Sequence, residues 1–144
     1  MSDFLVRPAE PDDLRFVCAS WFESFWKGAM QHTGMQYADY KRGQDALIRC
    51  LLERSRVSIL GHVITPGEIV GYAVIEPTPG AHERADQTVH YCYVKSSFRR
   101  FGAAKGLLRG KCTRYSHMTK AGNRVARSLG LVYDPYTLST EGAP

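Results

Sequence analysis

The sequence lacks any long apolar run. None of its segments approaches the roughly 20 consecutive apolar residues that a membrane-spanning helix needs, and the polar start of the chain is not a signal peptide. We therefore expect a cytoplasmic protein with no membrane partner. Internal repeats, linkers and low-complexity segments are also missing, and 144 residues are typical of one domain. We expect a single domain over residues 1–138 and a flexible C-terminal tail over 139–144.

Cysteine and histidine are few, and neither shows the spacing of a metal site. The four cysteines form no C-x-x-C pair, and the five histidines have no ligand spacing. The pattern therefore predicts neither a disulfide framework nor a bound metal. The cysteines fall in predicted helices and strands, where we expect reduced thiols in or near the core: Cys18, Cys50, Cys92 and Cys112.

Acidic residues are missing from a long part of the second half. No carboxylate occurs between Lys95 and Arg127, and residues 91–144 carry ten basic and two acidic side chains. Residues 1–90 carry nine basic and twelve acidic side chains, so the two parts have net charges of +8 and −3. The asymmetry predicts an anion-binding surface in the second part.

The apolar periodicity predicts an α/β protein with six strands and four helices. Residues 27–36, with two glycines, are expected to form a loop between the first two helices. The predicted order is βααβββαβαβ, with strands over 4–7, 57–63, 69–76, 88–95, 112–118 and within 131–138, and helices from 12–13 onward and over 37–54, 102–110 and 119–129.

A turn of small residues stands between the predicted strand 88–95 and the helix that follows it. Gly102, Ala103 and Ala104 keep side chains away from the free N–H groups at the helix start, where an anion such as a phosphate can bind. The spacing is not that of a Walker loop, G-x-x-x-x-G-K-[ST]. A dinucleotide fingerprint, G-x-G-x-x-G in an early βαβ unit, is also absent.

The same turn resembles the acetyl-coenzyme A motif of the GNAT superfamily of N-acetyltransferases, V-x-P-x-[FY]-[RQ]-R-x-G-[IA]-[GA]-x-x-L-L. The sequence departs from the motif at Ser96, where the family often has proline. Small phage-encoded members resemble the chain in size. The matching positions are Val94, Phe98, Arg99, Arg100, Gly102, Ala103, Ala104, Leu107 and Leu108.

Weaker similarities extend the resemblance over residues 1–138. The stretch 4–14 resembles the opening strand of the family, 69–76 resembles its third strand, and 128–131 resembles the end of its fourth helix. The resemblance implies a mixed, mostly antiparallel sheet flanked by about four helices.

The resemblance also implies acetyl-CoA as co-substrate and a primary amine of a small molecule or protein as acceptor. In the family, strands 4 and 5 diverge, and the pantetheine arm pairs with the backbone of strand 4, here Cys92, Tyr93 and Val94. Asn123 on the last helix would be a further contact. The residues that would hold the pyrophosphate are Arg99, Arg100, Gly102, Ala103, Ala104 and Lys105.

Two catalytic positions of the family are not matched. Thr88 stands where some members place a glutamate base, and Ala126 stands where others place a tyrosine acid. His90 lies two residues after Thr88 on the same strand face and is our candidate base. Tyr133 is a candidate acid that reaches in from a neighbouring strand, as is Tyr115.

Two other functions remain open. The unmatched acid and base positions are consistent with a catalytically weak module that binds acyl-CoA, a protein partner or both. The basic half could also bind nucleic acid, but no interleaving of aromatic and basic residues and no helix-turn-helix spacing supports this. We expect a monomer or a homodimer, and the sequence does not indicate which amine is the acceptor.

Overall fold

The computed structural model describes residues 3–65, 67–77, 87–99 and 102–138. They form strands, α-helices and short 3₁₀ helices (η) in the order β1 (Phe4–Pro8), α1 (Asp13–Gly28), η1 (Met30–Thr33), α2 (Tyr37–Arg54), β2 (Arg56–His62), β3 (Gly71–Pro77), β4 (Gln87–Val94), η3 (Ser96–Phe98), α3 (Ala103–Leu108), β5 (Arg114–Tyr115), α4 (Lys120–Leu129), β6 (Val132–Tyr133) and η4 (Pro135–Leu138).

The strands form one sheet in the order β1-β2-β3-β4-β5-β6. β1 to β4 pair antiparallel along most of their lengths, whereas β4 pairs with β5, and β5 with β6, in parallel over two residue pairs each. The long strands therefore make a firm antiparallel half, and the C-terminal strands add a short parallel edge.

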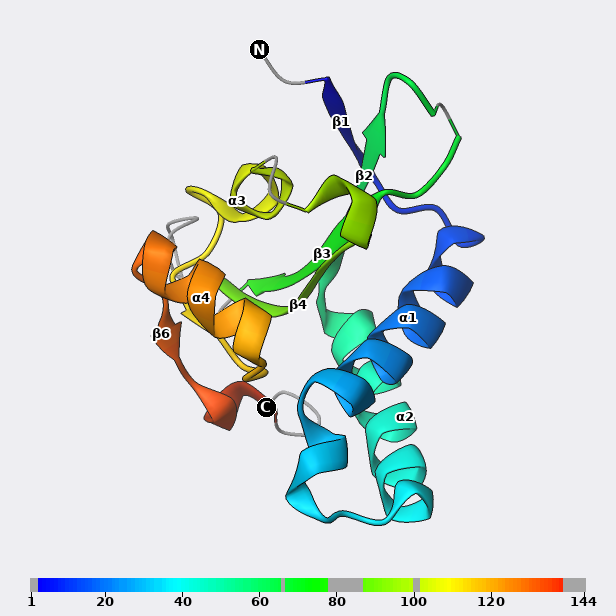
Figure 1. The fold of residues 1–144 in the computed structure, drawn as a ribbon, viewed down its shortest axis with the longest axis vertical. Coiled ribbons are helices and arrows are strands. Elements are labelled where there is room, and N and C mark those ends of the chain that lie inside the picture. Colours follow the sequence, from blue (N-terminus) through cyan, green and yellow to red (C-terminus); the bar gives the residue numbers. More distant parts are fainter. Residues whose placement is uncertain (1–2, 66, 78–86, 100–101, 139–144) are drawn as a thin grey trace.

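Helices cover both sides of this sheet (Figure 1). α1 and α2 lie on one side, where large aromatic residues such as Trp21, Tyr72 and Tyr91 form the core. α3 and α4 lie on the other side, where the core consists of smaller side chains such as Val94, Leu107 and Leu108. The sheet separates two apolar clusters of different composition.

The predicted order of elements is confirmed, because helices and strands alternate as βααβββαβαβ in the described residues. The bounds differ most near the C-terminus. The strand predicted over 112–118 is only Arg114–Tyr115, and the segment 131–138 holds the two-residue strand Val132–Tyr133 followed by a 3₁₀ helix. The predicted loop 27–36 contains the end of α1 and the 3₁₀ turn Met30–Thr33.

The short β5 has a structural cause. Its backbone pairs with β4 only at the beginning of β4. The two segments diverge after Ser116, whose N–H donates to the C=O of Val89. A strand that leaves its neighbour has no ladder to extend, although its side chains still alternate. Sequence periodicity therefore predicted too long a strand.

Two further expectations from the sequence concern the cysteines and membrane-spanning segments. All four cysteines lie among the described residues as thiols and not as disulfides, one of them buried and three half-buried. A search of the described residues finds no helix with the length and apolar character to cross a membrane. The predicted tail 139–144 lies outside the described residues.

Candidate active site

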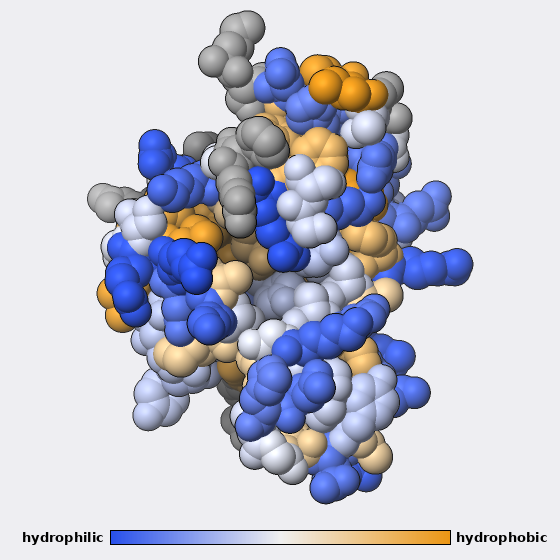
Figure 2. Space-filling model, viewed as in Figure 1, coloured by the Kyte–Doolittle hydropathy of each residue, from blue (hydrophilic) through white to orange (hydrophobic). Residues whose placement is uncertain are grey.

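A cleft of about 750 Å³ opens where β4 and β5 part. Its walls come from β4, from the last three turns of α1, from α3 and from the first half of α4. Figure 2 shows this face of the molecule hollowed between the two helical walls, with hydrophilic side chains along both rims. The cleft is large enough for the narrow arm of a cofactor and a small acceptor group.

Backbone groups of β4 face the cleft. The N–H of Lys95 donates to the C=O of Val70, so the backbone of every second residue counted back along β4 is paired with β3. Cys92 and Val94 therefore turn their N–H and C=O groups to the opposite edge, where β5 has left. The backbone of Tyr93 is paired with β3, which differs from the expectation, and Tyr93 lines the cleft with its side chain instead.

The predicted phosphate turn begins α3. Gly102 has a φ of 75°, a left-handed conformation that favours glycine, and nothing lies within 4 Å of the position a Cβ would take. Gly106 N–H is the first to bond back, to Gly102 C=O, so the N–H groups of Ala103, Ala104 and Lys105 have no acceptor within the helix. This arrangement agrees with the predicted anion cradle.

Of the two arginines of the motif, only Arg99 lies among the described residues. Arg99 lines the cleft, and its Nε donates to the C=O of Val94 over 2.7 Å. Its guanidinium is thus held at the end of β4, beside the cradle. Arg100 lies outside the described residues. Among the small residues of the turn, Ala104 also lines the cleft.

Asn123 on α4 carries a buried acceptor with no donor. Its side-chain Oδ1 is inaccessible to solvent and has no hydrogen-bond partner among the described residues. An orphaned buried carbonyl costs about 1–3 kcal/mol unless a ligand satisfies it. Asn123 also borders a second hollow of about 460 Å³ on α4, together with Lys120, Arg124 and Arg127. Asn123 does not belong to the residues found to line the β4 cleft, and the basic hollow beside it suits an anion such as a phosphate.

The candidate base His90 lies at an irregularity of β4. Val74 of β3 pairs with Tyr91 and Ile75 pairs with Val89, so His90 is an extra residue without a partner on β3. The bulge keeps the ring on the α1–α2 side of the sheet, where Thr88 also points, as predicted from the strand alternation. His90 borders the cleft, but its side chain is fully buried.

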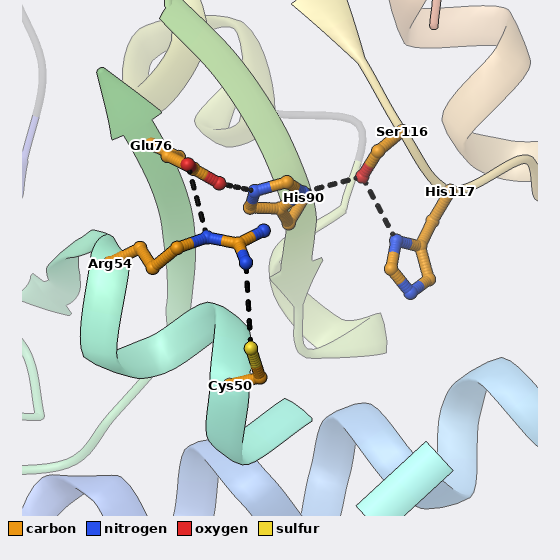
Figure 3. A network of polar contacts seen from close by, with 6 residues as sticks. All are labelled: Cys50, Arg54, Glu76, His90, Ser116 and His117. Atoms are coloured by element: carbon orange, nitrogen blue, oxygen red, sulfur yellow. Dashed lines mark hydrogen bonds and ion pairs between the residues drawn. The ribbon is translucent and has the colours of Figure 1, made fainter. Parts of the chain in front are cut away.

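The His90 ring is held at both nitrogens. Its Nε2 lies 2.6 Å from Glu76 Oε1, and its Nδ1 lies 2.6 Å from Ser116 Oγ. Glu76 Oε2 in turn accepts from Arg54 Nε over 3.1 Å (Figure 3). Burial lowers the pKa of His90, and the hydrogen bond with Glu76 opposes that shift. We infer that the imidazole is neutral at pH 7.

His117 is a site residue that sequence analysis did not select. It follows the end of β5, lines the cleft, and packs its ring edge-on against Trp21 and Phe25. Burial and the nearby His90 lower its pKa to about 3, so it is neutral at pH 7. His117 was predicted to lie within a strand over 112–118, but β5 ends at Tyr115. Because the position of His117 depends on where β5 ends, the sequence did not indicate that it would line the cleft.

Tyr133, the other predicted catalytic residue, lies apart from these histidines, and the two unmatched family positions carry no acid or base. Tyr133 is 40 % exposed on β6, and its ring packs on Tyr115, which lines the cleft. Thr88 is buried, and its Oγ1 has no hydrogen-bond partner among the described residues. Ala126 lines the cleft without a polar group. Neither position supplies an acid or a base.

The cysteine in the cleft is not a nucleophile. Burial raises the pKa of the Cys92 thiol to about 12, so it stays protonated at neutral pH. A covalent acyl-cysteine step therefore has no support from this thiol.

Comparisons with known proteins agree on the fold. No family model matches the chain, and no curated protein matches it by sequence. A GCN5-related N-acetyltransferase from Ralstonia eutropha JMP134 is similar in structure, with a TM-score of 0.61, 18 % identity, and coverage of 98 % of this chain and 97 % of that one. At this identity the comparison shows the fold alone.

Two other solved structures give the same result. YycN from Bacillus subtilis, a proposed acetyltransferase, has a TM-score of 0.60 at 15 % identity, covering 98 % of this chain and 92 % of that one. A proposed acetyltransferase from Clostridium difficile 630 has a TM-score of 0.57 at 12 % identity, covering 98 % of each chain. In all three cases nearly the whole chain is matched.

Proposed function

We propose that the protein, which has the GNAT acetyltransferase fold, is an N-acetyltransferase that uses acetyl-CoA and a primary amine. The observation that carries the proposal is the open edge of β4, where the backbone of Cys92 and Val94 faces a cleft that runs toward a phosphate-type turn. An extended arm can pair with such an edge as another strand would.

The residues of the chain fit acetyl-CoA along its length. The N–H groups of Ala103, Ala104 and Lys105 would bind the pyrophosphate, with charge supplied by Arg99, Lys105 and Arg100. Asn123, which borders the basic hollow on α4 with Lys120, Arg124 and Arg127, would be a further contact for the phosphate part of the cofactor. Each contact uses a group that the protein itself leaves unsatisfied or exposed.

The proposed reaction is direct attack of the amine nitrogen on the acyl carbon. Bound acetyl-CoA supplies an acyl group activated as a thioester. A β4 N–H facing the cleft, from Cys92 or Val94, stabilises the negative charge that develops on the acyl oxygen, and such a donor is typically worth about 3 kcal/mol. Tyr133, for which no contact with the cleft is found among the described residues, remains only a candidate acid.

A catalytically weak acyl-CoA-binding module is the second candidate. It is favoured by Thr88 and Ala126, which carry no acid or base at two positions where the family has them. Formation of an acetylated amine with release of free CoA thiol separates the two candidates, because a binding module would release no thiol.

Thermal unfolding with acetyl-CoA, CoA or ATP tests the cofactor. At a ligand concentration of 100 Kd, binding adds about 2.7 kcal/mol to the free energy of unfolding. We expect stabilisation by both CoA species in the wild type and none in Gly102→Glu, which places a carboxylate in the phosphate cradle. Gly102→Ala is the matched control, because it has the same backbone strain without the charge and should keep most of the stabilisation.

The outcomes are distinct. No stabilisation of the wild type by either CoA species would overturn the acetyltransferase proposal. Equal stabilisation of Gly102→Glu and the wild type would place the cofactor elsewhere. Once binding is established, a panel of alkylamines with a free-thiol readout tests for acetyl transfer.

A further inference from the structure

One face of α1 forms the wall of the cleft that lies across from α3 and α4 (Figure 1). The proposed cofactor contacts are on the β4 edge, α3 and α4, so the α1 wall is the side that the cofactor leaves for the acceptor. The lining residues of α1 follow helical spacing and belong to one stripe of the helix. They are Ser20, Glu23, Ser24, Lys27 and Gly28.

The two serines of this wall use their hydroxyl protons inside the protein. Ser20 Oγ donates to the C=O of Phe16 over 2.6 Å, and Ser24 Oγ donates to the C=O of Ser20 over 2.6 Å. Ser24 Oγ then accepts from the Tyr91 hydroxyl, which lies 2.6 Å away. These contacts fasten α1 to β4. The groups of the wall best able to bind a polar ligand are then its two charged side chains.

The two charged side chains form an ion pair at the rim of the cleft. Lys27 Nζ lies 2.8 Å from Glu23 Oε1, and the two side chains are 66 % and 67 % exposed. An exposed pair of this spacing contributes little to the stability of a helix, so little is lost when a ligand separates its members. The wall is open beyond Lys27, because nothing lies within 4 Å of the position that a Cβ would take at Gly28.

The other charges of the cleft restrict what this pair can bind. Among the described lining residues, Glu23 is the one carboxylate, whereas Lys27, Arg99 and Lys120 are basic. A ligand with a lone ammonium at Glu23 would be repelled by Lys27 and Lys120, and a ligand with a lone anion would be repelled by Glu23. A ligand that carries both charges side by side satisfies both members of the pair.

We propose that the acceptor is a free diamino acid, whose zwitterionic head binds between Glu23 and Lys27 and whose side-chain amine reaches the β4 edge. Glu23 binds the α-ammonium, and Lys27 binds the α-carboxylate. The inference rests on the proposed acetyltransferase function and names the substrate class of the same cleft. The head stays at the rim while the alkyl chain enters the cleft, so the amine that reacts is not the amine that is held.

The separation of the two amines has a chemical reason. A carboxylate that binds an ammonium favours its protonated form and so raises its pKa, and a protonated nitrogen has no electron pair with which to attack. An acceptor whose reacting amine lay on Glu23 would therefore be slowed by the contact that binds it. The side-chain amine at the β4 edge lies away from that carboxylate and loses its proton to water in the open cleft.

The head group takes no part in bond making. The uncharged side-chain amine bonds to the acyl carbon as the bond between that carbon and sulfur breaks. The proton that the nitrogen then loses balances the negative charge of the leaving thiolate, so the products are an amide and free CoA. The α-ammonium and α-carboxylate keep their charges throughout. The product is therefore a diamino acid that is acetylated on its side chain and free at its α-amine.

The first test measures binding and needs no turnover. Calorimetric titration of ornithine or free lysine into the complex of the protein with CoA should show binding, and Glu23→Gln and Lys27→Met should each weaken it about fivefold. Asp39→Asn is the matched control, because Asp39 pairs with Arg42 on α2 and does not belong to the residues found to line the cleft. An affinity that neither cleft variant changes would overturn the proposal.

The second test uses acceptors that lack one charge of the head, with acetyl-CoA and the free-thiol readout. The Nα-acetyl derivative of the diamino acid lacks the ammonium, and its amide lacks the carboxylate. We expect Glu23→Gln to raise KM for the intact acceptor and the amide but not for the Nα-acetyl derivative. Lys27→Met should raise KM for the intact acceptor and the Nα-acetyl derivative but not for the amide. An equal effect on all three acceptors would indicate a general defect of α1 and contradict the assignment.

The substrate class and the proposed function fail differently. A wild type that acetylates simple alkylamines as efficiently as ornithine or free lysine would overturn the diamino acid and leave the acetyltransferase proposal standing. A product acetylated at the α-amine would have the same meaning. A wild type that neither acetyl-CoA nor CoA stabilises would overturn the acetyltransferase proposal and the inference with it, and thermal unfolding gives that result before any acceptor is added.

Discussion

The two faces of the sheet bury different kinds of side chain. On the α1–α2 face, Trp21 stacks on Tyr91 with ring centroids 5.4 Å apart, and hydroxyl pairs such as Ser24 with Tyr91 tie α1 to β4. On the α3–α4 face the core is aliphatic, and α3 has only six residues, among them two alanines and a glycine. The polar α1–α2 face thus has an aromatic core with buried hydroxyl pairs, whereas the thin α3–α4 face has an aliphatic core under a short helix.

The difference follows the chemistry proposed for each face. A phosphate must approach the backbone closely, so the face that binds it has small residues at the start of α3. On the other face, the edge-on packing of Trp21 and Phe25 against His117 restrains the orientation of that ring. In the proposed function, the anion would therefore bind on the α3–α4 side of β4, opposite the aromatic core.

The largest expected losses in the free energy of unfolding come from truncating a large core residue on each face of the sheet. We expect Trp21→Ala to lower the free energy of unfolding by about 4 kcal/mol and Leu108→Ala by about 3 kcal/mol, because the tryptophan leaves the larger cavity. Urea unfolding at pH 7 measures both. A larger loss from Leu108→Ala would show that the thin face carries more of the stability than its packing suggests.

Acid should weaken the polar face selectively. The folded-state pKa of His117, about 3, lies below its ordinary value of 6.5, so the unfolded chain takes up a proton first. The stability from this group is complete above pH 6.5 and is lost as the pH falls toward 3, at up to about 1.4 kcal/mol per pH unit.

The variant His117→Gln isolates this contribution. Between pH 6.5 and pH 4.5 the wild type should lose up to about 3 kcal/mol more than the variant in urea unfolding. Burial also lowers the pKa of His90, which therefore adds to the acid sensitivity of both proteins. Parallel pH curves for the two proteins would contradict a buried neutral His117.

The smallest expected effect lies at the helix that closes the thin face. Thr119 caps α4, and its side-chain oxygen accepts from Gly122 N–H over 2.8 Å. Thr119→Ala should cost about 1 kcal/mol in thermal or urea unfolding, whereas Thr119→Ser should be nearly neutral. A loss well above that value would mean that the α3–α4 face depends on α4 as strongly as the other face depends on α1.

Local patterns were sufficient for much of the fold. Helix α2 was predicted with its observed bounds, and the order of all ten major elements was correct, because apolar spacing and glycine or proline breaks are local signals. The turn before α3 was equally visible, since Gly102 adopts the positive φ that only glycine takes without strain. The end of β5 was not predictable, because it depends on where a neighbouring strand turns away.

The candidate site divides in the same way. The proposed anion cradle could be predicted from the sequence, because its described part, Gly102 to Lys105, consists of consecutive residues and their backbone. Which side chains meet across the sheet could be seen only in the folded structure: Glu76, His90 and Ser116 are at least 14 residues apart in sequence, yet hydrogen bonds of 2.6 Å join them. A bulge in β4 and the divergence of β5 bring them together, and both depend on pairing between distant strands, which no local pattern encodes.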